Sequence, residues 1–412
     1  MAAPRVARFP GLAVLRYRQF ARFALCRFLT TLSWQMLGVA LAWQVYALTH
    51  DALALGFVGL SEFLPFVCLV MWGGHVADHA NRRDVLIVAW AVAGLCIGAL
   101  LGYTLEGGRS VWPIYAAIGT FGAGRAFWAP ALQAIVPGLV PREEFPRALA
   151  FNSSLFQTAA IAGPALGGVL FVFGATTVFA LCLALFVLSA LLMIPIGPHR
   201  PRADAPGSPL PSGRALLEGL RYVLHQRVVL GVISLDLFAV LFGGATALLP
   251  IYAADVLHIG PEGLGLLRAA PSVGAAITAV LLALRPIYRH AGACMFAGVG
   301  VFGVCTIVFG LSHSVALSLA ALFVLGSGDM LSVYVRGILV QLNTPDAIRG
   351  RVSAINSMFI GTSNELGGFE SGVTARWFGA VRAVLLGGVL TLAVVGGWMG
   401  LFPELRRLDR LH

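Results

Sequence analysis

Long apolar runs constrain the fold of this chain more than any other feature of its sequence. Each run holds roughly 20 or more mostly apolar residues, enough for a helix to cross the hydrocarbon of a bilayer. The twelve runs cover residues 20–47, 53–76, 84–105, 112–138, 148–172, 175–197, 228–253, 263–284, 292–311, 315–341, 352–375 and 379–402. A backbone inside lipid must satisfy its own hydrogen bonds, so the runs predict an all-α polytopic membrane protein with twelve transmembrane helices.

The composition argues against other classes of protein. Hydrophobic residues make up 58% of the 412 residues and charged residues only 11%, which is far more apolar than a soluble domain. All 28 basic residues are arginine, and they are spread through short loops, so the net charge of +10 does not indicate a nucleic-acid partner. The six cysteines lie inside apolar runs without metal-ligand spacing. We therefore expect no metal, no cofactor and no enzyme activity, and partners limited to a small-molecule substrate, protons and lipid, with the chain acting as a monomer.

The arginines flank the runs unequally. Loops on one side of the predicted membrane hold most of them, whereas the other side holds Arg109, Arg376 and Arg382. Because arginine-rich short loops stay in the cytoplasm, both termini are expected to be cytoplasmic. The predicted location is the bacterial cytoplasmic (inner) membrane, crossed many times.

The chain divides once, near its middle. Residues 198–214 are polar, rich in proline and without an apolar period, which is typical of a linker. Residues 215–227 alternate apolar and basic side chains at helical spacing and predict an amphipathic helix on the cytoplasmic surface. The expected domains are a six-helix bundle over 1–197, a cytoplasmic linker with this helix over 198–227, and a second six-helix bundle over 228–412.

The two halves repeat. Residues 141–153 match residues 345–357 at the first proline, at the second arginine and at the Asn-Ser pair of each segment. The same shift also aligns glycines at positions 122, 124 and 163 with glycines at 326, 328 and 367. A repeat of half the chain indicates a duplicated transporter fold, with its site near the bilayer midplane where the halves meet. The sequence therefore predicts two pseudo-symmetric bundles.

A polar turn over residues 73–86 separates the second and third runs. It resembles the loop between helices 2 and 3 of the major facilitator superfamily, and the matching residues are Gly74, Ala77, Asp78, Arg82, Arg83 and Leu86. The resemblance implies the major facilitator fold, with Gly74, Asp78, Arg82 and Arg83 at a cytoplasmic gate. His79 replaces the family's arginine, and Asn81 replaces a glycine, a change that a left-handed backbone tolerates.

Two further resemblances concern export. Gly163, Pro164, Gly167 and Gly168 resemble an element of the drug-proton antiporter branch, although glycine and proline at this spacing also suit close helix packing. Residues 55–66, 124–143, 234–253, 265–275 and 328–372 resemble the enterobactin-exporter-type group of the superfamily. That resemblance implies a proton-coupled exporter of a siderophore, drug or other small amphipathic molecule. An uptake permease, or a non-transporting membrane sensor on the same fold, remains the alternative.

Few ionisable groups lie inside the runs, where each costs roughly 2.5–3.5 kcal/mol at a helix centre. Glu62 and Glu365 lie near mid-depth without a cation close by on their own helix, and they are the first and second candidates for carrying the proton. Asp236 is the third. The resemblance to the superfamily implies that Arg125 tunes a carboxylate, and a structural pair is the alternative.

The remaining charges in the runs have structural interpretations. Asp329 and Arg336 share a helix face about two turns apart, which favours an ion pair. Glu370 lies roughly 140° around the helix from Glu365, so the two cannot face one ligand together. Arg268 lies near a helix end and can extend to the interface.

Aromatic and amide side chains inside the runs are candidates for lining a cavity, since this mixture suits a bulky amphipathic ligand. They are Trp34, Gln35, Phe127, Trp128, Gln133, Phe238 and Tyr334. Ordinary packing is the alternative for most of them.

Overall fold

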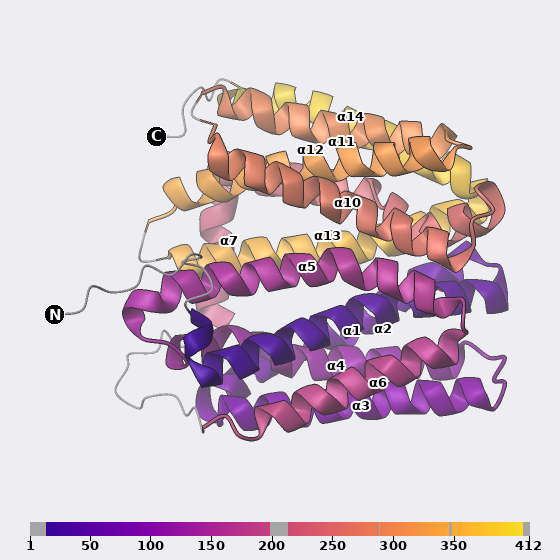
Figure 1. The fold of residues 1–412 in the computed structure, drawn as a ribbon. Coiled ribbons are helices and arrows are strands. Elements are labelled where there is room, and N and C mark those ends of the chain that lie inside the picture. The colour runs from indigo at the N-terminus through magenta and orange to yellow at the C-terminus, as the bar shows by residue number, and fades with distance from the viewer. Residues whose placement is uncertain (1–13, 198–212, 288, 346–347, 407–412) are drawn as a thin grey trace. The chain divides into compact units, whose positions relative to one another are not determined.

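A computed structural model describes residues 14–197, 213–287, 289–345 and 348–406, and helices dominate it (Figure 1). In the first half the helices are α1 (Arg18–Thr49), α2 (Ala52–His79), α3 (Arg82–Leu105), α4 (Trp112–Ile135), α5 (Phe145–Phe171) and α6 (Ala175–Met193). In the second half they are α7 (Gly213–His225), α8 (Arg227–Phe242), α9 (Leu249–Ile251), α10 (Gly260–Leu284), α11 (Ala291–Leu311), α12 (Val315–Leu342), α13 (Arg349–Phe378), α14 (Ala380–Leu401) and α15 (Pro403–Arg406). The predicted all-helical class is confirmed.

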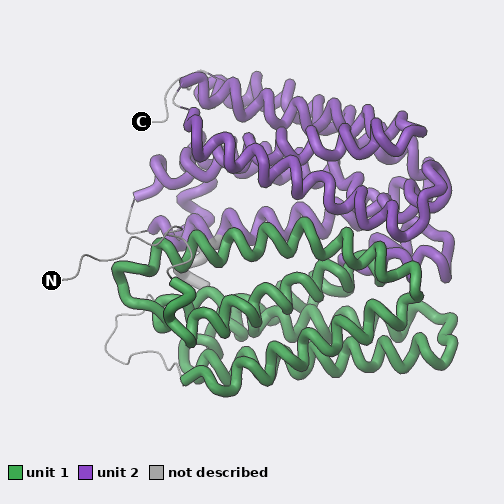
Figure 2. The backbone as a smooth tube through the Cα atoms, viewed as in Figure 1, with its two compact units in different colours: residues 1–41, 61–210 green, residues 42–60, 211–412 purple. Residues whose placement is uncertain are grey.

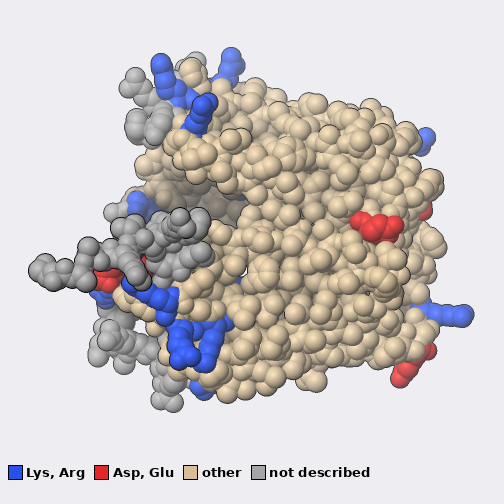
Figure 3. Space-filling model, in the orientation of Figure 1, with Lys and Arg blue, Asp and Glu red and all other residues tan. Residues whose placement is uncertain are grey.

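Ten helical segments of the described chain are long and apolar enough to cross a membrane. The predicted spans 112–138 and 352–375 correspond to α4 and α13, which are long helices with a lower apolar content and are not among the ten. The expected twelve spans are therefore approximately matched. On the face that Figure 3 shows, uncharged side chains cover most of the surface, as lipid requires, and the charged side chains lie toward its left and right edges.

The predicted seventh span, 228–253, is not one continuous helix. α8 ends at Phe242, and the chain continues through a 3₁₀ turn (Ala245–Leu248), the short α9 and a π-helical turn (Tyr252–Val256). The break begins at Gly243 and Gly244. A Cβ on Gly243 would stand 2.3 Å from the Phe302 ring, and one on Gly244 would stand 2.5 Å from the Gly367 carbonyl oxygen. Two adjacent glycines accept this crowding, and the helix stops where they occur.

The chain forms two compact units (Figure 2). Unit 1 comprises Met1–Leu41 and Ser61–Leu210, and unit 2 comprises Ala42–Leu60 and Pro211–His412. The division thus falls inside the predicted linker, of which residues 198–212 lie outside the described part, and α7 occupies the predicted amphipathic segment. The hairpin formed by the end of α1 and the start of α2 belongs to unit 2.

The two units use equivalent helix contacts. In unit 1, α3 packs against α4 and α6, and in unit 2, α11 packs against α12 and α14. The repeated glycines lie at equivalent crossings, because a Cβ on Gly122 would meet α2 at 2.1 Å and one on Gly326 would meet α10 at 2.0 Å. Glycine at these positions lets two helix backbones approach closely.

Candidate functional site

An ion pair joins Glu62 of α2 to Arg125 of α4 inside unit 1. The Arg125 guanidinium donates to the Glu62 carboxylate at 2.7 Å, and about a fifth to a quarter of each side chain is exposed. Gly122 positions the pair, since its missing side chain lets α4 rest on the backbone of Glu62. Arg125 follows Gly122 by about one helical turn and therefore extends from the same close crossing.

Two aromatic rings hold the Arg125 guanidinium. Its central carbon lies 4.3 Å from the centroid of Trp34 on α1 and 4.9 Å from that of Phe66 on α2. Cations are attracted to the faces of such rings, and away from water the attraction is worth about 2 kcal/mol. The arginine is therefore fixed by a carboxylate and two rings together.

A cavity of about 160 Å³ opens beside this pair. Its walls come from α1, α4 and α5 and comprise Arg27, Thr30, Thr31, Trp34, Arg125, Trp128, Ala129, Leu132, Gln133 and Phe156. Three predicted cavity residues, Trp34, Trp128 and Gln133, lie in this lining, with Arg125 beside them. Arg27 was not among the predicted site residues, although an arginine inside the run 20–47 was a visible signal.

Other predicted cavity residues lie elsewhere. Gln35 packs against Gly163, and Phe127 lines a separate groove between α2, α3 and α4. In unit 2, Phe238 lies 5.3 Å from the ring of Trp398, and Tyr334 packs against the apolar core that includes Val335. These side chains contribute to packing within their units.

Arg336 of α12 pairs with Asp236 of α8, and both side chains are almost fully buried. Spacing along one helix predicts Asp329 as its partner. That pairing is wrong, because a neighbouring helix supplies the carboxylate. Within the described chain Asp329 is half-buried and has no recorded hydrogen bond or ion pair.

Glu365 of α13 lies against the hairpin segment of unit 2. A Cβ on Gly59 would stand 2.8 Å from its carboxylate, and the guanidinium of Arg268 on α10 acts on it electrostatically. Arg268 is half-buried among these helices. Glu370 instead accepts a hydrogen bond from the Thr374 hydroxyl at 2.7 Å, one turn along its own helix. The two glutamates therefore have different surroundings, as their spacing predicts.

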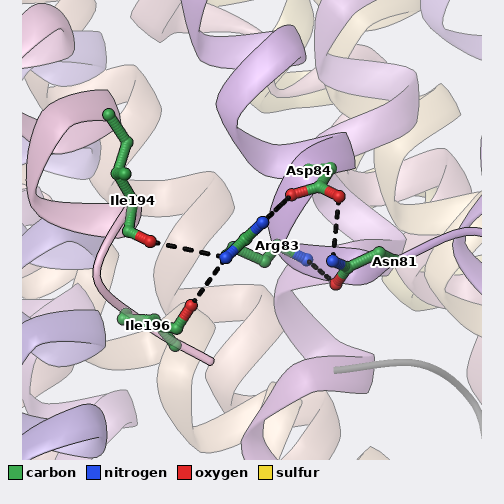
Figure 4. Close-up of polar contacts among 5 residues, drawn as sticks. All are labelled: Asn81, Arg83, Asp84, Ile194 and Ile196. Atoms are coloured by element: carbon green, nitrogen blue, oxygen red, sulfur yellow. Dashed lines mark hydrogen bonds and ion pairs between the residues drawn. The ribbon is translucent and has the colours of Figure 1, made fainter. Parts of the chain in front are cut away.

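The polar turn after α2 is built around Arg82 and Arg83. Arg82 donates to the Ala134 carbonyl at 2.7 Å, near the end of α4. Arg83 contacts Asp84 at 2.7 Å and the carbonyls of Ile194 and Ile196 after α6 (Figure 4). Both arginines thus satisfy carbonyls at helix C-termini, where a cation is favoured.

Asn81 does not adopt the left-handed backbone expected for a glycine replacement. Its φ is −67° and ψ is 112°, and its side chain accepts from the Arg83 backbone N–H as the N-cap of α3 (Figure 4). An asparagine side chain can supply this capping acceptor, which glycine lacks. Asp78 is half-buried and has no recorded hydrogen bond or ion pair among the described residues, whereas Asp84 holds Arg83. Gly74 is buried at the end of α2.

The glycine element of α5 faces α1 within unit 1. A Cβ on Gly163 would stand 2.5 Å from Gln35, and one on Gly167 would stand 2.9 Å from the backbone of Met36. Pro164 and Gly168 are buried in the same stretch. Its direct structural role is therefore close packing of α5 on α1.

These observations define the class: a polytopic helical protein of two units with matching helix contacts, with charged side chains and a cavity inside a bundle, has the architecture of a transporter of the major facilitator superfamily. The chain belongs to its transmembrane secretion effector family, whose model matches residues 10–411. The resemblance to the superfamily and to its enterobactin-exporter type is thus confirmed.

Curated relatives agree with this family. The chain is 29% identical over 403 residues to the Enterobactin exporter EntS of Citrobacter koseri, covering 94% of this chain and 92% of the relative. It is 29% identical over 350 residues to EntS of Escherichia coli, covering 82% and 80%.

Solved structures share the fold. A bacterial homologue of the human lysosomal transporter Spinster superposes with a TM-score of 0.75 at 12% identity, covering 94% of this chain and 97% of that one. The nucleoside transporter NupG gives 0.73 at 15% identity, covering 93% and 99%. A bacterial homologue of the iron transporter ferroportin gives 0.67 at 17% identity, covering 92% and 98%.

Proposed function

We propose that this transporter exports a small amphipathic molecule, such as a siderophore, drug or metabolite, across the bacterial inner membrane in exchange for protons. The observation that carries the proposal is the ion pair of Glu62 and Arg125 beside the cavity. The match to EntS proteins supports export, and the α5 glycine element agrees with it.

Glu62 is the proposed proton carrier. When Glu62 is ionised, it holds Arg125 at 2.7 Å. A proton on Glu62 removes the charge that holds this arginine, so protonation and the state of the cavity wall are linked. Arg27 and Arg125 both line the cavity, so its wall carries positive charge next to the carboxylate that would take up the proton. In alternating access, the carboxylate would take its proton from outside and release it inside.

The test uses the purified chain in liposomes with an imposed pH gradient. Glu62→Gln mimics the protonated state, so it should abolish gradient-driven transport while sparing substrate binding. Glu106→Gln is the matched control, because Glu106 is exposed after α3 and caps that helix only through its backbone. Glu365→Gln tests the second candidate, and Asp236→Asn the third.

Three outcomes would contradict the proposal. Full gradient-driven transport in both Glu62→Gln and Glu365→Gln would remove these carboxylates from coupling. Uphill accumulation in the direction opposite to export would instead establish an uptake permease, and binding with no transport in either direction would establish a sensor.

The proposed orientation places both termini and the 198–227 segment in the cytoplasm, on the basis of the arginine asymmetry. In intact cells, an impermeant thiol reagent should label a cysteine introduced at Gly108 and miss one introduced at Pro206. The reverse pattern would contradict the orientation.

A further inference from the structure

Arg27 is an arginine inside α1 whose charge has no partner in the described chain. It lies nine residues after the start of α1, roughly 13 Å along the helix axis. Its Nε is buried and makes no hydrogen bond, and no carboxylate of the described residues pairs with its guanidinium. An arginine keeps its positive charge at working pH, so Arg27 offers that charge to an anion that enters the cavity it lines.

The charges in the cavity wall do not balance. Arg27 and Arg125 both line the cavity, and the one recorded carboxylate partner of the two, Glu62, is already engaged with Arg125. The Thr30 hydroxyl donates to the backbone carbonyls of Cys26 and Arg27 in α1. The cavity therefore keeps one positive charge in excess.

The remaining lining combines aromatic and apolar side chains with one amide and the hydroxyl of Thr31. Trp34, Trp128 and Phe156 contribute rings, and Gln133 contributes the amide. A volume of about 160 Å³ is close to that of an engineered cavity of roughly 150 Å³ that binds benzene. The space thus suits one flat ring with a small charged group.

We propose that this cavity, the Arg27 subsite, binds the anionic aromatic part of the transported molecule, with Arg27 as the residue that selects negative charge. The inference rests on the proposed function for its claim that the ligand is the substrate. The substrate class is then an amphipathic molecule bearing an aryl carboxylate or an equivalent aryl anion. Arg27 gives the charge selectivity, and the rings give the preference for a flat group.

Binding to the purified full-length chain tests the subsite without any proton gradient. The probes are benzoate, its neutral counterpart benzamide, and cyclohexanecarboxylate, which keeps the charge and the size and loses the flat ring. Isothermal titration calorimetry should show benzoate bound at least tenfold more tightly than either of the others. Equal binding of benzoate and benzamide would overturn the proposal.

Variants assign the selectivity to Arg27. Arg27→Gln should weaken the binding of benzoate at least tenfold and leave the binding of benzamide unchanged, whereas Arg27→Lys should recover part of the loss. Arg22→Gln is the matched control, because Arg22 lies on the same helix and does not line the cavity. Unchanged benzoate binding in Arg27→Gln would overturn the assignment.

A second measurement covers the case in which Arg27→Gln does not fold. In a chain without its native cysteines, Thr31→Cys places a thiol in the lining while Arg27 stays. Benzoate should protect this thiol from N-ethylmaleimide, and benzamide should not. Lack of protection would count against the subsite and would leave proton coupling through Glu62 as a separate question, decided by its own transport assay.

Discussion

Gly122 lies directly on the backbone of Glu62: a Cβ at Gly122 would stand 2.1 Å from the Glu62 carbonyl oxygen. No real Cβ tolerates that distance, and the obstacle is backbone, which cannot rotate away. The Glu62–Arg125 ion pair therefore depends on a glycine that carries no chemistry of its own.

Gly122→Ala should push α4 away from α2 and lengthen or break the ion pair. We expect a lower thermal midpoint and a loss of most transport, measured on purified protein and in liposomes. Gly102→Ala is the control, since a Cβ at Gly102 in α3 meets nothing within 4 Å. Gly326→Ala should destabilise unit 2 comparably, because its Cβ would lie 2.0 Å from the Pro271 carbonyl oxygen, yet leave the Glu62–Arg125 pair intact. Equal activity of Gly122→Ala and Gly102→Ala would contradict this role.

The acids of unit 2 should differ sharply in their contribution to stability. Asp236→Asn leaves the buried Arg336 without its partner, which should cost about 3–5 kcal/mol. Asp329→Asn removes a carboxylate that has no recorded partner among the described residues, so the thermal midpoint should stay level or rise. The two variants are compared by thermal unfolding in one detergent. A larger loss in Asp329→Asn would reverse the assignment of partners.

The sequence predicts the helices well because the bilayer sets their length and polarity. The partners of charged side chains are harder to predict, since spacing along one helix does not reveal what a neighbouring helix supplies. Spacing favoured Asp329 for Arg336, whereas α8 provides Asp236. The break after Phe242 had a local signal in two adjacent glycines.

Asp78 and Asp84 flank the same turn, and they should behave differently. Asp84 holds Arg83, which in turn binds carbonyls after α6, so Asp84→Asn should mainly lower stability by roughly 1 kcal/mol. Asp78 has no recorded partner among the described residues, which suits a residue that acts in another state of the transport cycle. Asp78→Asn should insert normally and lose most transport. Normal transport by Asp78→Asn at normal expression would remove its proposed gate role.

The hairpin of residues 42–60 offers a comparison between charge and packing within unit 2. Asp51 pairs with Arg376 at 3.3 Å, but their side chains are 34% and 55% exposed, so the pair should contribute at most about 1 kcal/mol. At Gly372, α13 packs closely on the hairpin backbone. A Cβ on Gly372 would stand 2.9 Å from the Ala52 carbonyl oxygen and 3.1 Å from the Gly56 Cα.

Packing should therefore outweigh charge at this hairpin. Gly372→Ala should lower the thermal midpoint more than Asp51→Asn, because a backbone contact cannot relax by rotating a side chain. Gly361→Ala is the matched control, because Gly361 lies on α13 and a Cβ there would meet nothing within 4 Å. A Cβ on Gly379 would also meet nothing, but the φ of +85° at Gly379 would strain any side chain. Thermal unfolding of the three variants gives the order directly. If Asp51→Asn proves the most damaging, the exposed ion pair and not the glycine crossing holds the hairpin on α13.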